Sequence, residues 1–208
     1  NIAERGIWTA KKRYILNVWN SEGVQYSEPK LKVMGIEAVK SSTPAPCRQM
    51  IKDGLKLMMN GTEEDVIEFI DKCRVEFKAL PPEQIAFPRT VSDVRKYHSH
   101  SSIYSKGTPI HARGALLFNH YIKDKKLTNK YSLIANGEKI KFLYLKKPNI
   151  IQENVISFIQ DFPHELGLDK YIDYDLQFEK SFVEPLKAIL DAIGWNVEKT
   201  VNLELFFA

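Results

Sequence analysis

The chain of 208 residues is long enough for one or two domains, and its 44% hydrophobic content is enough to build a core. Its apolar runs are far shorter than the ~20 residues of a membrane span, and the first residues, NIAERG, carry no signal-peptide pattern, so we expect neither a membrane-spanning nor a secreted protein. The net charge of +4 permits an acidic partner such as nucleic acid without requiring one. We therefore expect a cytoplasmic protein without a membrane partner. Because the chain opens on Asn1 rather than a start methionine, we also expect it to be part of something longer.

Two β-rich segments open the chain. Residues 7–19 and 24–36 are rich in Val, Ile, Tyr and Trp, and the turn-like sequence NSEG at 20–23 joins them, which predicts a hairpin. The sequence KKRY, residues 11–14, lies inside the first segment. Alternation along one strand would place side chains on two faces, Lys12 and Tyr14 on one and Lys11 and Arg13 on the other.

Helical patterns follow these strands. The sequence CRQMIKDGLKLMM predicts a helix over 47–59, with Ser42 or Thr43 as its cap. A second helix is predicted over 62–80, because Thr62 and Asp65 resemble a capping box and an apolar face follows them. The two helices should pack as an antiparallel pair.

The second half of the chain mixes helices and strands. Residues 81–110 read as a loop-rich connection around one short helix at 91–97. Beyond them we predict helices over 111–124, 151–161 and 178–193, the last kinked by Pro185, and a hairpin of strands 128–135 and 137–145 across Asn136-Gly137. The predicted fold class is α+β, in which a small antiparallel hairpin or sheet precedes a mainly helical part with a small β-hairpin.

Two groups of residues are weak candidates for catalysis. Asp173 and Asp175 could hold Mg²⁺ together, but acidic residues commonly precede a helix, and we favour that interpretation. His98 and His100 could bind a metal, but no Cys or acidic partner follows at a ligand-like spacing, so a solvated loop is favoured. The GxSxG, Walker and GxGxxG motifs are absent from the sequence. The sequence therefore predicts no catalytic site of its own.

Basic side chains are the remaining candidates. They fall into three groups, namely Lys11, Lys12 and Arg13 beside Tyr14, then Lys30, Lys32 and Lys40, then Lys106, His111 and Arg113. These groups could line a track for phosphates, or they could be solvated faces, which is the usual state of lysine. Composition alone does not choose between the two.

The order of the motifs resembles a known family. WTAKKRYILNVW at 8–19 and YSEPKLKVMGIEAVKSSTP at 26–44 closely resemble the end of the palm and the start of the thumb in family B DNA polymerases of large tailed bacteriophages. That family shows W-T-G-K-K-R-Y, then E-P-x-L-K-x-M-G-x-E, then S-S-T-P. The resemblance continues as HxRG at 111–114 and FEKSFVxPL at 178–186. Ala10 replaces the usual glycine, a change that should be tolerated unless the backbone there needs a positive φ.

The resemblance implies roles in binding DNA. Lys12 and Tyr14 match the K-x-Y element, whose cation and hydroxyl reach the minor groove of the new duplex, where every base pair presents acceptors. Lys11 and Arg13 would bind phosphates or neighbouring acidic side chains. Contacts to the phosphate backbone are implied for Ser41, Ser42, Thr43, His111 and Arg113.

The resemblance also implies a division of the chain. Residues 1–44 would be a remnant of the palm, 45–199 the thumb, and 200–208 a tail that binds a sliding clamp. In this tail, Leu203, Phe206 and Phe207 reproduce the spacing of clamp-binding peptides. A final strand or helix packed on the body is the alternative for the same residues.

The family's catalytic aspartates lie in two palm motifs, one that ends a strand near S-L-Y-P and one in a G-D-T-D hairpin, and this sequence lacks both. The chain should therefore bind primer–template DNA as the C-terminal part of a DNA-directed DNA polymerase, a nucleotidyltransferase, while being inactive alone. Mg²⁺ would be held by a catalytic N-terminal part in the same or a separate chain. The alternative is a stand-alone, non-catalytic module that binds duplex DNA or is recruited by the clamp, and a hydrolase using Asp173 and Asp175 ranks far behind.

Overall fold

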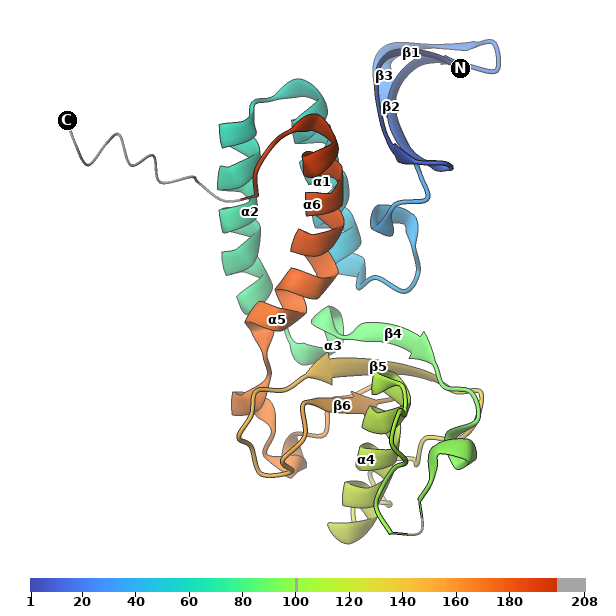
Figure 1. Cartoon of the computed structure of the whole chain (residues 1–208), viewed down its shortest axis with the longest axis vertical. Coiled ribbons are helices and arrows are strands. Elements are labelled where there is room, and N and C mark those ends of the chain that lie inside the picture. The colour runs from blue at the N-terminus through green and yellow to red at the C-terminus, as the bar shows by residue number, and fades with distance from the viewer. Residues whose placement is uncertain (100, 198–208) are drawn as a thin grey trace, which may run out of the picture. The chain divides into compact units, whose positions relative to one another are not determined.

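A computed structural model describes residues 1–99 and 101–197. The chain divides into two compact units, which we call the first unit (Asn1–Ala79 with Phe178–Ala208) and the second unit (Leu80–Gln177). Two three-stranded antiparallel sheets and several helices make up these units (Figure 1), which confirms the predicted α+β class. Within the described ranges, no helix combines the length and the hydrophobicity needed to cross a membrane.

The sheet of the first unit has the order β1 (Ile2–Ala10), β2 (Arg13–Ser21), β3 (Val24–Met34). The hairpin predicted across residues 20–23 is confirmed as the β2–β3 connection. The prediction of one strand over 7–19 was wrong, because Lys11 and Lys12 form a turn between β1 and β2. Lys12 takes a left-handed backbone conformation (φ 63°), which reverses the chain within two residues. Alternation therefore does not place Lys11 and Lys12 on opposite faces of a strand.

Helices complete the first unit after the short 3₁₀ turn η1 (Glu37–Val39). The predicted pair is present as α1 (Ala45–Asn60) and α2 (Glu63–Lys78), and both halves of the Thr62–Asp65 capping box are formed. The cap predicted at Ser42 or Thr43 was wrong, since Pro44 occupies the N-cap position of α1 and no side chain caps the helix. Pro46 fits the first turn, where its missing N–H is not needed.

The predicted C-terminal helix is present in four parts. They are α5 (Tyr174–Phe178), the π-helical turn η5 (Glu179–Val183), α6 (Glu184–Leu190) and the 3₁₀ turn η6 (Asp191–Ile193). Pro185 is the second residue of α6, two positions after the end of the π-helical turn. Because proline has no N–H to donate to the carbonyl one turn earlier, the departure from α geometry falls in the turn just before this residue. Phe178, Phe182, Leu186 and Ile189 are fully buried, as their helical spacing predicts.

The second unit is built around the sheet β4 (Phe87–Thr90), β5 (Lys139–Tyr144), β6 (Val155–Phe158), with β5 in the centre. Helix α4 (Ile110–Asp124) packs on β6, and Gly114 permits a close approach, because a Cβ there would lie 2.4 Å from Ser157 Oγ. Short helical elements complete the unit, namely α3 (Pro82–Ile85), η2 (Val94–Tyr97), η3 (His164–Leu166) and η4 (Asp169–Tyr171).

Three predictions in this unit need correction. Residues 128–135 form no strand, because the Asn119 side chain takes both backbone hydrogen bonds of Ile134. The helix predicted over 151–161 is instead strand β6, whose four residues are all buried, and a short apolar run of this kind does not distinguish the two states. The loop-rich interpretation of 81–110 overlooked β4, and only the 3₁₀ turn η2 stands in place of the helix at 91–97.

Candidate nucleic-acid interface

The net charge of the chain is carried by one unit. The second unit contains 14 Lys and Arg against 10 Asp and Glu, together with all five His, while the first unit contains 16 of each sign. A phosphate-binding surface on the first unit therefore has to come from local clustering rather than from net charge.

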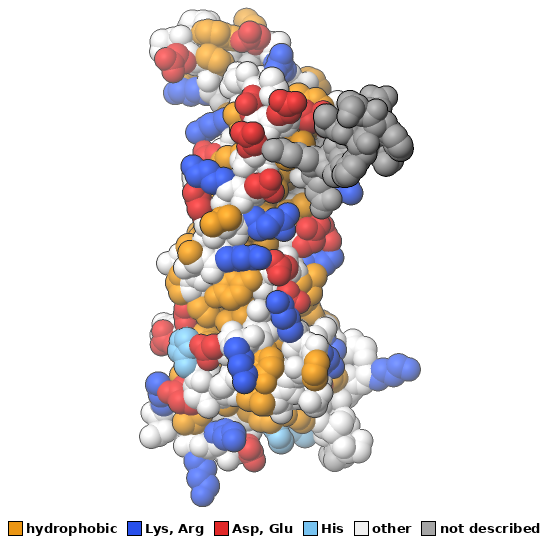
Figure 2. All heavy atoms as spheres, turned by 90° about the vertical axis from the view of Figure 1, so that its left-hand side faces the viewer, with side chains coloured by type: hydrophobic (Ala, Val, Ile, Leu, Met, Phe, Trp, Pro, Cys, Tyr) orange, Lys and Arg blue, Asp and Glu red, His pale blue; other side chains and the backbone are white. Residues whose placement is uncertain are grey.

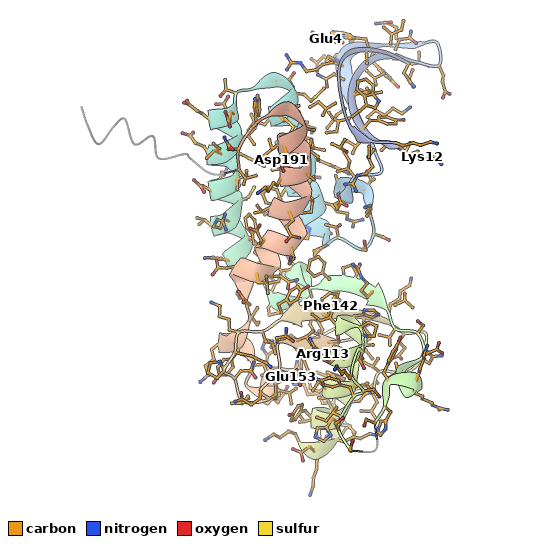
Figure 3. The ribbon with its side chains drawn as sticks, viewed as in Figure 1. Glu4, Lys12, Arg113, Phe142, Glu153 and Asp191 are labelled. Carbon is orange, nitrogen blue, oxygen red and sulfur yellow. The ribbon has the colours of Figure 1, made fainter. Side chains whose placement is uncertain are left out.

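The β1–β2 turn is such a cluster. Lys11 and Lys12 are both exposed and have no ion-pair partner among the residues that the structure describes, and Figure 3 shows the Lys12 side chain extending away from the strands. Gly35 supports this turn, because it has a left-handed φ of 69° and a Cβ there would lie 2.3 Å from the Lys12 carbonyl oxygen. Tyr14 follows in β2 and is half-buried. The turn thus presents two exposed cations, three residues or fewer from a half-buried tyrosine in the same motif.

Arg13 behaves differently from its two neighbours. Its guanidinium donates to Glu37 Oε2 at 3.0 Å, and Lys40 Nζ lies 2.7 Å from Glu37 Oε1. One carboxylate thus joins β2 to the segment before α1. The resemblance left phosphate or a neighbouring acid open as the partner of Arg13, and the structure shows the acid.

The charge of Glu37 is stabilised by this arrangement. Burial acts to raise the pKa of its carboxyl, but the hydrogen bond from Lys40 and the nearby charge of Arg13 outweigh it and hold the pKa below its ordinary value. A depressed pKa in the folded state contributes stability above the unfolded-state pKa, and this stability is lost as the pH falls through the folded-state value.

Glu37→Gln should therefore remove a pH-dependent part of the stability of the first unit. We expect a loss of about 1 kcal/mol at pH 7, since the pair is partly exposed, and the difference from the parent chain should vanish as the pH falls through the lowered folded-state pKa and the parent carboxyl becomes protonated. Urea unfolding at a series of pH values measures this. Glu22→Gln, in the exposed β2–β3 turn, is the matched control. A Glu37→Gln difference that stays constant with pH would contradict the role of the charge.

Ser41, Ser42 and Thr43 lie between η1 and α1. Ser41 is exposed and Ser42 half-buried, while Thr43 is only 6% exposed and its backbone N–H donates to Lys40 O. The exposed hydroxyl nearest to the start of α1 is therefore that of Ser41. The phosphate contacts predicted for these three residues remain predictions.

His111 and Arg113 lie in the first turn of α4, in the second unit. Arg113 donates to Asn154 Oδ1 at 2.6 Å, and its guanidinium lies 5.6 Å from the centre of the Tyr104 ring; Figure 3 shows it beside Glu153. Tyr104 in turn donates to Glu153 at 2.5 Å. Burial, and then the charge of Arg89, lower the pKa of His111. The described contacts of Arg113 thus lie within the second unit, where they connect α4 to Tyr104 in the preceding loop and to Asn154.

The two weak catalytic candidates take structural places. Asp173 Oδ1 accepts a hydrogen bond from the Leu176 N–H at 3.0 Å at the start of α5. This agrees with the favoured interpretation of Asp173 as an acidic residue that precedes a helix. Asp175 lies in the first turn of α5, 4.0 Å from Lys146. The His98 carbonyl accepts a hydrogen bond from Ser105. Across residues 1–99 and 101–197, no three His, Cys, Asp or Glu side chains come together as a metal site.

His100 and the tail residues Leu203, Phe206 and Phe207 lie outside the described residues.

Helix α2 is a poor surface for nucleic acid. Its sixteen residues carry six acidic and three basic side chains. Figure 2 shows acidic and basic side chains interspersed over this face of the chain, with no large basic area. The β1–β2 turn, with two adjacent exposed lysines, is therefore a better candidate than α2 for binding nucleic acid.

Sequence reasoning overlooked two residues that shape this turn. Glu37 neutralises Arg13, and Gly35 fits under the Lys12 carbonyl. Both belong to the MGIE sequence at 34–37, which marks them as part of the same motif but not as partners of KKRY. Only the pairing of β2 with β3 brings the two stretches together.

Comparison with known proteins gives relatives along nearly the whole chain. The DNA-directed DNA polymerase of Enterobacteria phage T4 is 31% identical over 206 residues, which are 97% of this chain and 22% of that protein. The DNA-directed DNA polymerase of Escherichia phage RB69 is 34% identical over 203 residues, 95% of this chain and 22% of the relative. No family model matches the chain. The chain spans about a fifth of the length of these relatives, and it is related by sequence to part of the phage DNA-directed DNA polymerases.

Proposed function

We propose that this chain is the C-terminal palm and thumb part of a family B DNA polymerase, and that it holds primer–template DNA for an active site supplied by another part. The observation that carries the proposal is the pair of exposed, unneutralised lysines at the β1–β2 turn, in a chain whose relatives are DNA-directed DNA polymerases. Cations of this kind bind the phosphate backbone or the groove acceptors without reading sequence, which suits a copying enzyme.

The contribution to catalysis is positional in this proposal. Holding the primer end in place converts a bimolecular encounter into an oriented one, which lowers the barrier without any catalytic group from this chain. Mg²⁺ and the catalytic aspartates belong to the remaining part of the polymerase, because the S-L-Y-P and G-D-T-D motifs are absent here. Residues 1–44 act as the palm remnant and 45–199 as the thumb. Leu203, Phe206 and Phe207 of the tail contact a sliding clamp.

A binding titration tests the proposal. The chain is titrated against fluorescent primer–template and against single-stranded DNA of matched length, from 50 to 300 mM salt. We expect the chain to bind primer–template more tightly than single-stranded DNA, and we expect its affinity to fall steeply as the salt concentration rises. Restored primer extension on mixing with a catalytic N-terminal polymerase fragment would support the positional role. Binding without any gain in extension would favour the stand-alone duplex-binding module. If the chain binds no DNA, either alone or mixed with the catalytic fragment, the proposal is overturned.

The same extension assay, run with and without the sliding clamp, tests the tail. Deleting residues 203–208 should abolish only the clamp-dependent increase in product length, because the predicted anchors are removed. Loss of folding instead, followed by circular dichroism, would support a tail that packs on the body.

A further inference from the structure

Trp8 is a large aromatic side chain that the fold leaves open. It lies in β1 and is 63% exposed. The strand register places it opposite Tyr14 in β2, and Tyr14 opposite Met34 in β3, which is 43% exposed. These three residues form one row across the sheet, which we call the open row.

The open row does not belong to the core of the first unit. The neighbouring row, Ile7–Ile15–Val33, points to the other face, and there Ile7 is 9% and Ile15 0% exposed. Strand β1 contacts α6 and η6, and Arg5 donates to the Met59 carbonyl of α1 at 2.5 Å. One face of the sheet thus carries the packing, and Trp8 stands on the other.

The indole of Trp8 reaches back over Gly6. A Cβ built on Gly6 would lie 2.5 Å from Cη2 and 2.7 Å from Cζ3 of Trp8, and 2.7 Å from Cδ2 of Leu16. The six-membered ring therefore covers the Gly6 backbone beside Leu16, and any side chain at position 6 would displace it. Because Trp8 is 63% exposed, much of its surface is open to a ligand although the ring edge packs against Gly6.

The surroundings of this ring are basic. The open row ends next to the turn with Lys11 and Lys12, and the row beside it, Gly6–Leu16–Lys32, adds a third lysine. Neither row contains a carboxylate, and the nearby Glu37 is neutralised by Arg13 and Lys40. Aromatic rings laid on a sheet among cations are the arrangement by which proteins bind unpaired bases, because every base has a face that stacks.

We propose that Trp8 stacks on an unpaired base of single-stranded DNA next to the duplex held at the β1–β2 turn. The inference rests on the proposed function and adds a base-stacking site to it. Lys32 and the turn lysines contact the phosphates that flank the stacked base, and Gly6 leaves room for the ring in its position. Stacking of this kind is independent of sequence, as a copying enzyme requires.

The test uses the full chain and two fluorescent DNAs, a duplex with a 5′ oligo-dT overhang and the same duplex with an abasic overhang. Trp8→Ala should weaken binding to the dT overhang about tenfold, the range measured for loss of one stacked base. Trp8→Phe should retain most of the affinity, since a ring is kept, and Gly6→Val should behave like Trp8→Ala. Binding to the abasic overhang should be weaker for the parent chain and unchanged by Trp8→Ala.

Controls separate this site from the proposed function. Val24→Ala, at a residue of β3 that is 58% exposed, should leave all affinities unchanged. If the parent chain binds no duplex, the proposed function fails; if it binds duplex but Trp8→Ala binds the dT overhang as tightly as the parent, only the stacking site is overturned. A Trp8→Ala chain that keeps its DNA affinity but no longer associates with a catalytic fragment would show that the open row is a protein contact, which also overturns the stacking site.

Discussion

Phe182→Ala is expected to lower the free energy of unfolding of the first unit by about 3–5 kcal/mol. The Phe182 side chain is fully buried, and its ring centre lies 4.9 Å from that of Phe178 and 6.5 Å from that of Phe69. Removing the ring deletes its contact with Phe69 of α2 and leaves a cavity among buried side chains.

Tryptophan fluorescence during urea unfolding measures this change selectively. All three tryptophans, Trp8, Trp19 and Trp195, belong to the first unit, so excitation near 295 nm follows that unit alone. The matched control is Val75→Ala in α2, where the side chain is 72% exposed and the expected change is within about 0.5 kcal/mol. An equal decrease in the free energy of unfolding for Phe182→Ala and Val75→Ala would contradict the placement of Phe182 in this core.

The second large effect concerns the β1–β2 turn. The double variant Lys11→Ala, Lys12→Ala should weaken primer–template binding about 60-fold at 0.1 M salt, if each lysine releases one counterion and is worth about eightfold there. Alanine and lysine have a similar cost in the left-handed conformation of residue 12, so the change removes charge while leaving the turn in place.

The salt dependence of the same variant distinguishes the roles of the two lysines. The slope of log K against log salt should become shallower by about 1.8 if both lysines bind phosphates, and by about 0.9 if Lys12 reaches the minor groove instead. Lys72→Ala in α2, whose lysine pairs with Glu76, is the matched control and should change neither affinity nor slope. Gly35→Ala keeps both charges but crowds the Lys12 carbonyl. A lower affinity of this variant for DNA would show that binding also depends on the shape of the turn. An unchanged slope in the double variant would remove the turn from the interface.

Local signals in the sequence determined several elements correctly. The Thr62–Asp65 capping box, the 3.6-residue spacing of Phe178, Phe182 and Leu186, and the turn before Val24 each act within a few residues, so the sequence alone predicts α2, the C-terminal helix and the β2–β3 hairpin. The order of the WTAKKRY and MGIE motifs likewise indicated relatives among phage DNA polymerases.

Other features depended on contacts between residues far apart in the chain. Asn119 satisfies the backbone of Ile134, which turns a predicted strand into a loop, and burial against α4 and β5 makes residues 155–158 a strand rather than part of a helix. At the candidate interface, the neutralisation of Arg13 by Glu37 depends on the pairing of β2 with β3. A sequence pattern records which side chains are polar or apolar, but the partner that satisfies a charge or a backbone group is chosen only when the chain folds.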